Sequence, residues 1–454
     1  MSRIHFIAIG GSAMHNLALA LQKKGFKVTG SDDEILEPSR TRLQNAGLLP
    51  DKEGWFPERI TTDIDALILG MHARADNPEL IEAQKKGLRI FSYPEYLYEF
   101  SKDKKRVVIG GSHGKTTITS MILHVLKLKG LDFDYMVGAQ LEGFDTMVKL
   151  SDAPVIVLEG DEYLASPVDR RPKFHLYHPH VALISGIAWD HINVFPDYEM
   201  YVEQFKIFVN KIEKGGSFIY CQNDDEVLKL ATDVLQTVSK QPYGIPDYSI
   251  ENGITYINHN GRKTSLKIFG EHNLMNMEGA RCVCNHLGID DDAFYEMISS
   301  FKGAAKRLEF VGGNNTVSVF KDFAHSPSKL KATTNAVKQQ FGNRKLIACM
   351  ELHTFSSLNE NFLEQYKNSM NLADEAYVYF NPHTIEHKKL KPISELQVKN
   401  AFNRHDLKVY NNSKELVNDL LKTKQHDSVY LMMSSGNFDG VDLKQFSEKV
   451  MGEV

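Results

Sequence analysis

The chain contains few of the residues that cross-link small exported proteins. Its 454 residues include only four cysteines, Cys221, Cys282, Cys284 and Cys349. Their spacing fits neither a disulfide framework nor a zinc-binding pair, so we expect reduced cysteines in or near the core. The sequence also lacks a run of about 18 apolar residues, and we expect no membrane insertion.

Clusters of basic residues are missing as well. Lys and Arg number 53 against 58 Asp and Glu, which leaves a formal net charge of −5. This balance does not suit a nucleic-acid-binding protein, and no nucleic-acid partner is expected. The N-terminal residues pass directly into an expected strand, Ile4–Ile9, without the charged and apolar regions of a signal peptide. We therefore expect a cytoplasmic protein, and its length predicts about three domains.

A short strand, a glycine-rich turn and a helix are predicted in succession near the end of the first quarter. Residues 106–109 are mostly β-branched, residues 110–114 contain three glycines, and a helical pattern begins at Lys115. Backbone N–H groups and a helix N-terminus bind phosphate in such a loop. We expect Lys115 to contact the outer phosphates of a nucleotide and the Thr116 hydroxyl to bind Mg²⁺. Ile109 occupies the position of the first glycine in the strict P-loop pattern.

The first hundred residues alternate strands and helices. The turn after the first strand consists of small residues, and Asp32 follows the second strand about twenty positions later. This is the layout of a dinucleotide site, but Ala8 and Ala13 stand where glycines are expected. We interpret the unit as a site for a nucleotide-type ligand rather than NAD. The residues expected there are Gly10, Gly11, Ser12, Asp32 and His72.

Two strands in the middle of the chain are expected to end in metal-binding side chains. The apolar run 154–158 delivers Glu159 at its end, where P-loop proteins place a metal-binding acid. The second strand, at 181–185, precedes His191, for which a structural role and a role as ligand of a second cation are both open. The sequence therefore predicts a metal site opposite the phosphate loop.

The remaining chain returns to regular alternation after a β-hairpin pattern at 250–270. Asn273 is a candidate cap for the helix that follows, and Asn276 is suited to an adenine edge. From residue 317 onward, strands and helices alternate again, with Pro327 in the first turn of a helix. We expect a separate open α/β domain there.

Seven motifs in order resemble the Mur ligases, the ATP-dependent amide-bond-forming enzymes of cell-wall synthesis. They are Gly10-Gly11, GSHGKTT at 111–117, EGDEY at 159–163, DH at 190–191, GEHNLMN at 270–276, KRLE at 306–309 and DFAHSP at 322–327. The resemblance spans essentially the whole chain. It implies an α/β protein of three domains with open, mainly parallel sheets: a Rossmann-like UDP-sugar domain (1–104), a P-loop ATPase domain (105–304) and a Rossmann-like domain for the amino substrate (305–454).

The resemblance also implies roles for individual residues. Thr116 and Glu159 would hold Mg²⁺, and His191 a second Mg²⁺. Lys206 lies at the spacing of a carbamylated lysine found in several members. The implied ATP-site residues are Gly111, Ser112, His113, Gly114, Lys115, Thr116, Thr117, Asn276 (adenine), Arg307 (γ-phosphate) and Asp322 (ribose). The implied catalytic residues are Lys115, Glu159, His191, Arg307 and His325.

Within the family, several stretches resemble the branch that acts in murein peptide recycling. They are residues 162–163, 169–174, 190–195 and 323–325. That branch joins UDP-N-acetylmuramate to the tripeptide L-alanyl-γ-D-glutamyl-meso-diaminopimelate. The branch that uses free L-alanine is the alternative, because residues 351–355 depart from the recycling pattern. A folylpolyglutamate-synthase-like ligase and a nucleotide switch without ligation are more distant alternatives.

Overall fold

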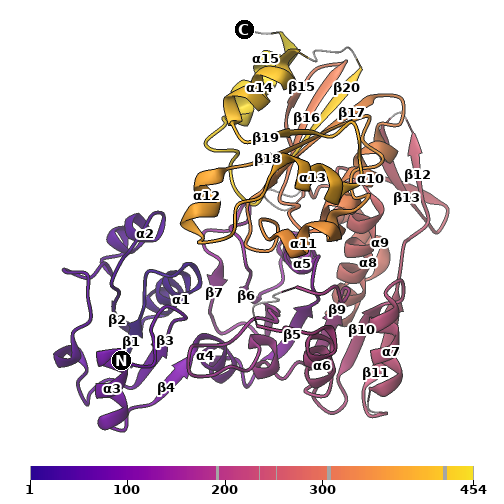
Figure 1. Cartoon of the computed structure of the whole chain (residues 1–454). Coiled ribbons are helices and arrows are strands. Elements are labelled where there is room, and N and C mark those ends of the chain that lie inside the picture. Colours follow the sequence, from indigo (N-terminus) through magenta and orange to yellow (C-terminus); the bar gives the residue numbers. More distant parts are fainter. Residues whose placement is uncertain are drawn as a thin grey trace. The chain divides into compact units, whose positions relative to one another are not determined.

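The chain folds into two compact units of the α/β class. The computed structural model describes residues 2–190, 194–234, 236–251, 253–303, 308–422 and 427–452. The first unit comprises Met1–Gly244 and Asn276–Ile298, and the second comprises Ile245–Met275 and Ser299–Val454. Apart from one antiparallel hairpin sheet in the second unit, the sheets of both units are mainly parallel, which confirms the predicted fold class (Figure 1).

The first unit begins with a parallel sheet in which the described strands follow the order β2-β1-β3-β4. Its elements are β1 (Arg3–Ile7), α1 (Ser12–Lys23), β2 (Lys27–Ser31), α2 (Ser39–Asn45), η1 (Pro57–Arg59), β3 (Ala66–Leu69), α3 (Pro78–Lys85), β4 (Ile90–Ser92) and α4 (Tyr93–Phe100). Ser92 and Glu95 form a capping box, so α4 begins directly where β4 ends.

A larger sheet follows in the same unit, with the order β11-β10-β9-β5-β8-β6-β7. Its elements are β5 (Lys105–Gly110), α5 (Lys115–Lys129), β6 (Asp134–Met136), β7 (Val148–Lys149), β8 (Val155–Glu159), η2 (Lys173–Leu176), β9 (Val181–Ile184), α6 (Tyr198–Val209), β10 (Ser217–Cys221), α7 (Asp225–Asp233), β11 (Ser239–Tyr243), α8 (Glu271–His286) and α9 (Asp291–Ile298). β5 pairs in parallel with β8 and β9, with Ile109 opposite Glu159. The phosphate loop and Glu159 therefore follow neighbouring strands at the same edge of the sheet.

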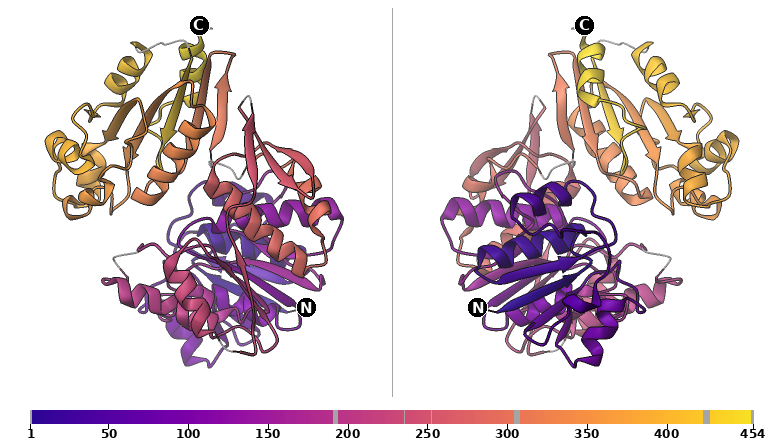
Figure 2. Two further views of the ribbon diagram at one scale, coloured as in Figure 1. Left: turned by 90° about the vertical axis from the view of Figure 1, so that its right-hand side faces the viewer. Right: turned by 90° about the vertical axis from the view of Figure 1, so that its left-hand side faces the viewer.

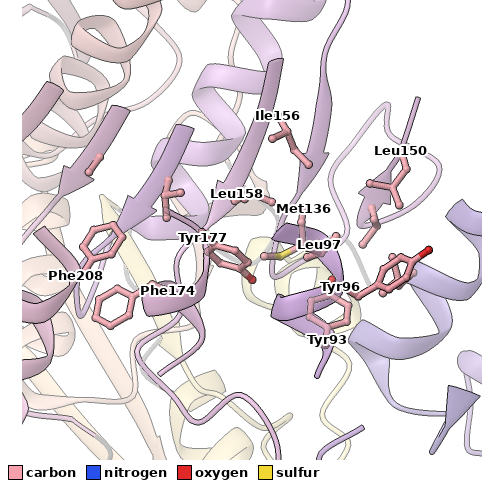
Figure 3. Close-up of a cluster of buried hydrophobic side chains, with 14 of the residues drawn as sticks. Tyr93, Tyr96, Leu97, Met136, Leu150, Ile156, Leu158, Phe174, Tyr177 and Phe208 are labelled. Carbon is pink, nitrogen blue, oxygen red and sulfur yellow. The ribbon is translucent and has the colours of Figure 1, made fainter. Parts of the chain in front are cut away.

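One buried hydrophobic cluster contains residues from both sheets of the first unit. Tyr93 and Leu97 of α4 lie in it together with Leu158 of the larger sheet (Figure 3). The ring of Phe174 stacks on that of Phe208, with centroids 4.6 Å apart. Because this core is continuous, the two sheets pack together within the first unit.

The second unit contains an antiparallel hairpin sheet and a mainly parallel one. The first has the strands β12 (Tyr248–Glu251), β13 (Ile254–His259) and β14 (Arg262–Leu266). The second has the order β15-β16-β20-β17-β18-β19, with β15 antiparallel to β16. Its elements are β15 (Glu309–Gly313), β16 (Val317–Asp322), α10 (Pro327–Gln340), β17 (Lys345–Leu352), α11 (Glu360–Leu363), η3 (Glu364–Tyr366), β18 (Glu375–Phe380), α12 (Pro382–His387), α13 (Glu395–Phe402), β19 (Lys408–Tyr410), α14 (Ser413–Lys422), β20 (Ser428–Met433) and α15 (Leu443–Met451).

Alternate residues of these strands enter two separate cores. Leu346 and Ala348 of β17 pack with α10 and α13, whereas Ile347 and Cys349 pack with α14 and α15. Successive side chains of a strand point to opposite faces, so both faces of the sheet are covered by helices (Figure 2). This explains the nearly continuous apolar sequence of β17.

Several sequence predictions are confirmed and a few are wrong. β8 ends at Glu159, α10 begins at Pro327, and all four cysteines are buried and free. Asn273 is not a helix cap, because α8 starts before it, and its Nδ2 donates to the Phe269 carbonyl at 2.9 Å. Residues 358–372 have the apolar spacing of one helix but form only the short α11 and η3, and Asn368 beyond them takes a left-handed φ of +62°. Among the described residues, no helix is long and apolar enough to cross a bilayer.

The shared core of the first unit allows a test of the fold. Leu97 is fully buried, and Leu97→Ala should lower the free energy of unfolding of this unit by about 2–5 kcal/mol, because it removes buried methyl groups and leaves a cavity. Denaturant unfolding followed by circular dichroism measures the change. Leu36→Ala is the control, because Leu36 is 64% exposed, and it should change stability by less than about 0.5 kcal/mol. Equal losses in the two variants would contradict the buried position of Leu97.

Candidate active site at the phosphate loop

The phosphate loop connects β5 to the N-terminus of α5. Gly111 and Gly114 have φ values of +127° and +83°, which residues with a Cβ rarely adopt. A Cβ at position 114 would also lie 2.4 Å from Oδ1 of Asn276. Asn276, the residue predicted for adenine, thus lies directly against the loop. The helix N-terminus at Lys115 offers the backbone N–H groups that bind phosphate.

Lys115 is held against the loop by two hydrogen bonds. Its Nζ donates to the Gly111 carbonyl at 2.7 Å and to Oε2 of Glu162 at 2.6 Å. Burial disfavours the charged ammonium, but the carboxylates of Glu162, Asp161 and Glu159 outweigh it and raise the pKa of Lys115. The lysine is therefore a permanent cation at the position expected for ATP phosphates. The acid that pairs with Lys115 is Glu162, three residues after the predicted metal ligand Glu159.

Glu159 contacts the loop from the neighbouring strand. Its Oε1 accepts from the Thr116 hydroxyl and its Oε2 from the Gly138 N–H, each at 2.8 Å. Burial raises the pKa of Glu159, while the Gly138 N–H, Lys115 and the Thr116 hydroxyl oppose that change. Thr116 and Glu159 thus bring two hard oxygen atoms together, and their role as Mg²⁺ ligands stays a prediction.

Two oxygen-bearing side chains are too few for a metal ion that is bound only by protein ligands, but they suit Mg²⁺. Among the residues that the structure describes, no group of three or more His, Cys, Asp or Glu side chains is placed to hold a metal ion. Mg²⁺ commonly takes only one or two protein oxygens and completes its octahedron with phosphates and water. The pair of Thr116 and Glu159 suits an ion that arrives with a nucleotide.

A chain of hydrogen bonds links Lys115 to the segment after β9. The Ala188 N–H donates to Oγ of Ser112 at 2.9 Å, and Ser112 lies 2.7 Å from Oη of Tyr201. The Tyr201 hydroxyl in turn donates to Oε1 of Glu162 at 3.2 Å. Since Ser112 accepts from Ala188 and Tyr201 donates to Glu162, the Ser112 hydroxyl donates to Tyr201. Every group in this chain is satisfied, and it holds Glu162 in position for Lys115.

A cavity of about 290 Å³ in the first unit brings several predicted residues together. Its lining includes Gly11 and Ser12 from the turn after β1, His72 from the loop after β3, and Glu159. Three of the residues expected for the UDP-sugar therefore share one cavity with the predicted metal ligand.

Asp32 and Gly10 are hydrogen-bonded to each other in the turn after β1, and their contact with a UDP-sugar stays a prediction. Oδ2 of Asp32 accepts from the Gly10 N–H at 2.6 Å, and Oδ1 accepts from the Asp33 N–H at 3.0 Å. Burial raises the pKa of Asp32 to about 6, against the lowering effect of the Gly10 hydrogen bond. The carboxylate shapes the turn, while neither residue lines the cavity.

Three other predicted residues are not placed at the phosphate loop or in the cavity by the described part of the structure. His191 and Arg307 lie outside the described residues. Lys206 is on α6, and its Nζ is 3.6 Å from Oδ2 of Asp233 on α7, in an ion pair that is about half exposed. It does not line the cavity. A carbamylated Lys206 stays a prediction.

Asp322 and His325 belong to the second unit. The Asp322 carboxylate accepts from the backbone N–H groups of Leu308 and Ala324, each at 2.7 Å. It also lines a cavity of about 460 Å³ in that unit. Nδ1 of His325 is 2.8 Å from the Phe323 carbonyl. Asp322 therefore organises the turn after β16, and the predicted ATP contact of this residue stays a prediction.

Comparison with known proteins identifies the family. Residues 3–105, 109–284 and 306–436 match the models "Mur ligase family, catalytic domain", "Mur ligase middle domain" and "Mur ligase, glutamate ligase domain". The UDP-N-acetylmuramate–L-alanine ligase of Clostridium kluyveri is 32% identical over 81% of each chain. The chain belongs to the Mur ligase family. Like other Mur ligases, it is an ATP-dependent, amide-bond-forming ligase of peptidoglycan synthesis.

Solved structures of two Mur ligases share this fold. The murein peptide ligase of Psychrobacter arcticus aligns with a TM-score of 0.64 at 23% identity, over 100% of this chain and 99% of that one. The UDP-N-acetylmuramate–alanine ligase of Thermotoga maritima aligns with a TM-score of 0.69 at 21% identity and the same coverage.

The geometry of the phosphate loop predicts that adding one methyl group at Gly114 weakens ATP binding. Gly114→Ala should raise the KM for ATP by about tenfold or more, because the new Cβ meets Asn276 at a left-handed position. ATP-dependent ADP release measures the change. Gly130→Ala is the matched control at the other end of α5. Gly130 has a φ of +71°, and no heavy atom of the described residues comes within 4 Å of its Cβ position. It should cost stability and leave the KM for ATP unchanged.

The hydroxyl of Tyr201 provides a second test at the loop. Tyr201→Phe should lower kcat/KM for ATP about tenfold, because a hydrogen bond to a charged group is lost beside Lys115. Tyr177→Phe removes an equally buried hydroxyl that has no hydrogen-bond partner among the described residues, and it should leave these kinetics unchanged. If both variants behaved alike, the chain of hydrogen bonds would have no role in ATP use.

Proposed function

We propose that this Mur ligase joins the lactyl carboxylate of UDP-N-acetylmuramate to the amino group of an L-alanine residue. The main support is the cavity that contains both Ser12, expected for the UDP-sugar, and Glu159. Glu159 accepts a hydrogen bond from Thr116 of the phosphate loop at 2.8 Å. A sugar carboxylate in this cavity would lie beside the phosphate that activates it. ATP, UDP-sugar and amine are all metabolites of the cytoplasm, which is the location proposed for the enzyme.

The reaction requires activation because a carboxylate is a poor electrophile. A carboxylate oxygen of the donor attacks the γ-phosphorus of ATP, the bond to the bridging oxygen breaks, and ADP leaves. The amine nitrogen of the acceptor then attacks the acyl carbon, loses a proton, and the tetrahedral intermediate expels phosphate. Each step creates one bond and breaks one bond at the same centre.

Residues of the loop would reduce the electrostatic repulsion between the donor carboxylate and ATP in the first step. Both reactants are anionic, so their approach has to be screened. Lys115 would exchange the Glu162 carboxylate for the β- and γ-phosphates. Mg²⁺ held by Thr116 and Glu159 would supply further positive charge at the transferring phosphoryl group. Contributions of His191, Arg307 and His325 stay predictions from their motifs.

Two acceptors fit this proposal, and different observations support them. Free L-alanine is favoured by the comparisons, because the Clostridium kluyveri relative is named for it. The tripeptide L-alanyl-γ-D-glutamyl-meso-diaminopimelate is favoured by residues 169–174 and 190–195, which resemble the recycling branch. The solved murein peptide ligase and alanine ligase, at 23% and 21% identity, support the fold without choosing between acceptors.

A competition between acceptors decides this point. With UDP-N-acetylmuramate and ATP present, ADP release should depend on an added acceptor, because the acyl phosphate is consumed only by the amine. The kcat/KM values for L-alanine and for the tripeptide should differ by about tenfold or more, in favour of the true acceptor. D-alanine is the control and should support no turnover. Steady ADP release that is independent of both donor and acceptor would contradict the ligase proposal.

A further inference from the structure

We propose that Lys173 binds the carboxylate of the donor substrate in the cavity of the first unit. This inference rests on the proposed function and adds a substrate-binding residue to it. Lys173 lines the same cavity as Glu159, Asp161 and Ser12. It lies in the segment 169–174, to which neither the phosphate-loop motif nor the metal-ligand prediction gives a role.

The backbone around Lys173 is fixed by hydrogen bonds and packing. Its N–H donates to the Tyr163 carbonyl at 2.9 Å, and the next N–H, of Phe174, donates to the Asp161 carbonyl at 3.1 Å. The Phe174 ring is fully buried and stacks on Phe208. The start of η2 is thereby tied to the segment that follows Glu159, so the lysine side chain leaves from a rigid point.

The ammonium group is oriented by a carboxylate. Nζ of Lys173 is 2.6 Å from Oδ2 of Asp161. A lysine ammonium has three N–H donors, so a bond to Asp161 leaves others that can reach an anion in the cavity. The side chain is 23% exposed, so a bound anion would meet a partly desolvated cation. Asp161 thus acts as a positioning residue for Lys173.

The charges of the cavity indicate which part of the donor binds there. Glu159 and Asp161 bring two carboxylates to this wall, and an incoming carboxylate would be repelled by them. Lys173 and His72 are the basic residues of the described lining. The lactyl carboxylate must approach Glu159 and Thr116 to be phosphorylated, whereas the diphosphate is at the other end of the UDP-sugar. Lys173 therefore compensates the carboxylate at the reacting end.

The experiment compares two ligands that differ in the lactyl group. Dissociation constants of UDP-N-acetylmuramate and UDP-N-acetylglucosamine are measured by calorimetry, with competition titration for the weaker ligand. In Lys173→Gln, the affinity for UDP-N-acetylmuramate should fall about tenfold or more, because a charge-assisted hydrogen bond is lost. The affinity for UDP-N-acetylglucosamine, which has no carboxylate, should change by less than about twofold.

Any other pattern of affinities would overturn either the role of Lys173 or the donor assignment. A similar loss for both ligands would show that Lys173 contacts the diphosphate or supports the fold, and would overturn the proposal. No loss for either ligand would leave only the structural ion pair with Asp161, with the same consequence. Wild-type protein that does not bind UDP-N-acetylmuramate would refute the donor assignment itself, whereas tight wild-type binding with an unaffected Lys173→Gln variant refutes this inference alone.

Two variants control for charge and folding. Lys173→Arg keeps the cation and should bind UDP-N-acetylmuramate within about threefold of wild type. Arg171→Gln removes a cation two residues away that is 57% exposed, pairs with Asp169 and Glu95, and does not line the cavity. It should leave both affinities unchanged. Thermal unfolding of every variant establishes that binding is compared between folded proteins.

Discussion

The buried carboxylate of Glu159 connects the phosphate loop, the segment after β6 and the cavity of the first unit. One of its oxygens accepts from Thr116 of the phosphate loop and the other from Gly138 after β6, while the side chain also lines the cavity. Removing a hydrogen-bonded carboxylate of this kind leaves buried donors unsatisfied. The predicted metal ligand thus contacts both the phosphate loop and the cavity. The parallel pairing of β5 with β8 places it there.

Two further acidic side chains follow Glu159 within three residues, and each is paired with a lysine. Glu162 pairs with Lys115 at 2.6 Å, and Asp161 pairs with Lys173 at the same distance. Buried charges are tolerated when they are paired and hydrogen-bonded, and are costly otherwise. Binding of anionic substrates would redistribute these partners: the lysines gain phosphate or carboxylate, and the acids keep hydroxyl or backbone donors. Tyr201 already donates to Glu162, and this hydrogen bond would remain if Lys115 bound a nucleotide instead.

Much of this arrangement could be predicted from the sequence because the signals are local. The strand, loop and helix around Lys115 are contiguous, and the run that ends at Glu159 is a typical buried strand. Both are confirmed as β5, α5 and β8. Local signals were weaker where tertiary packing decides. Asparagine commonly caps helices, yet α8 begins two residues before Asn273. The apolar spacing at 358–372 arises from turns that bury Leu363, Tyr366 and Met370.

Partners that are distant in the chain could not be predicted in this way. Tyr201 is 89 residues from Ser112, and Glu162 is 47 residues from Lys115. Helical periodicity marks Tyr201 only as a core residue, and nothing in the order of residues 169–174 shows which side chain enters a cavity. The sequence by itself determined the family, the fold class and the phosphate loop, because these depend on short patterns in a particular order. Only the tertiary structure decided which acid holds Lys115 and which cation lines the cavity, because parallel strands bring together side chains that the intervening helices separate along the chain.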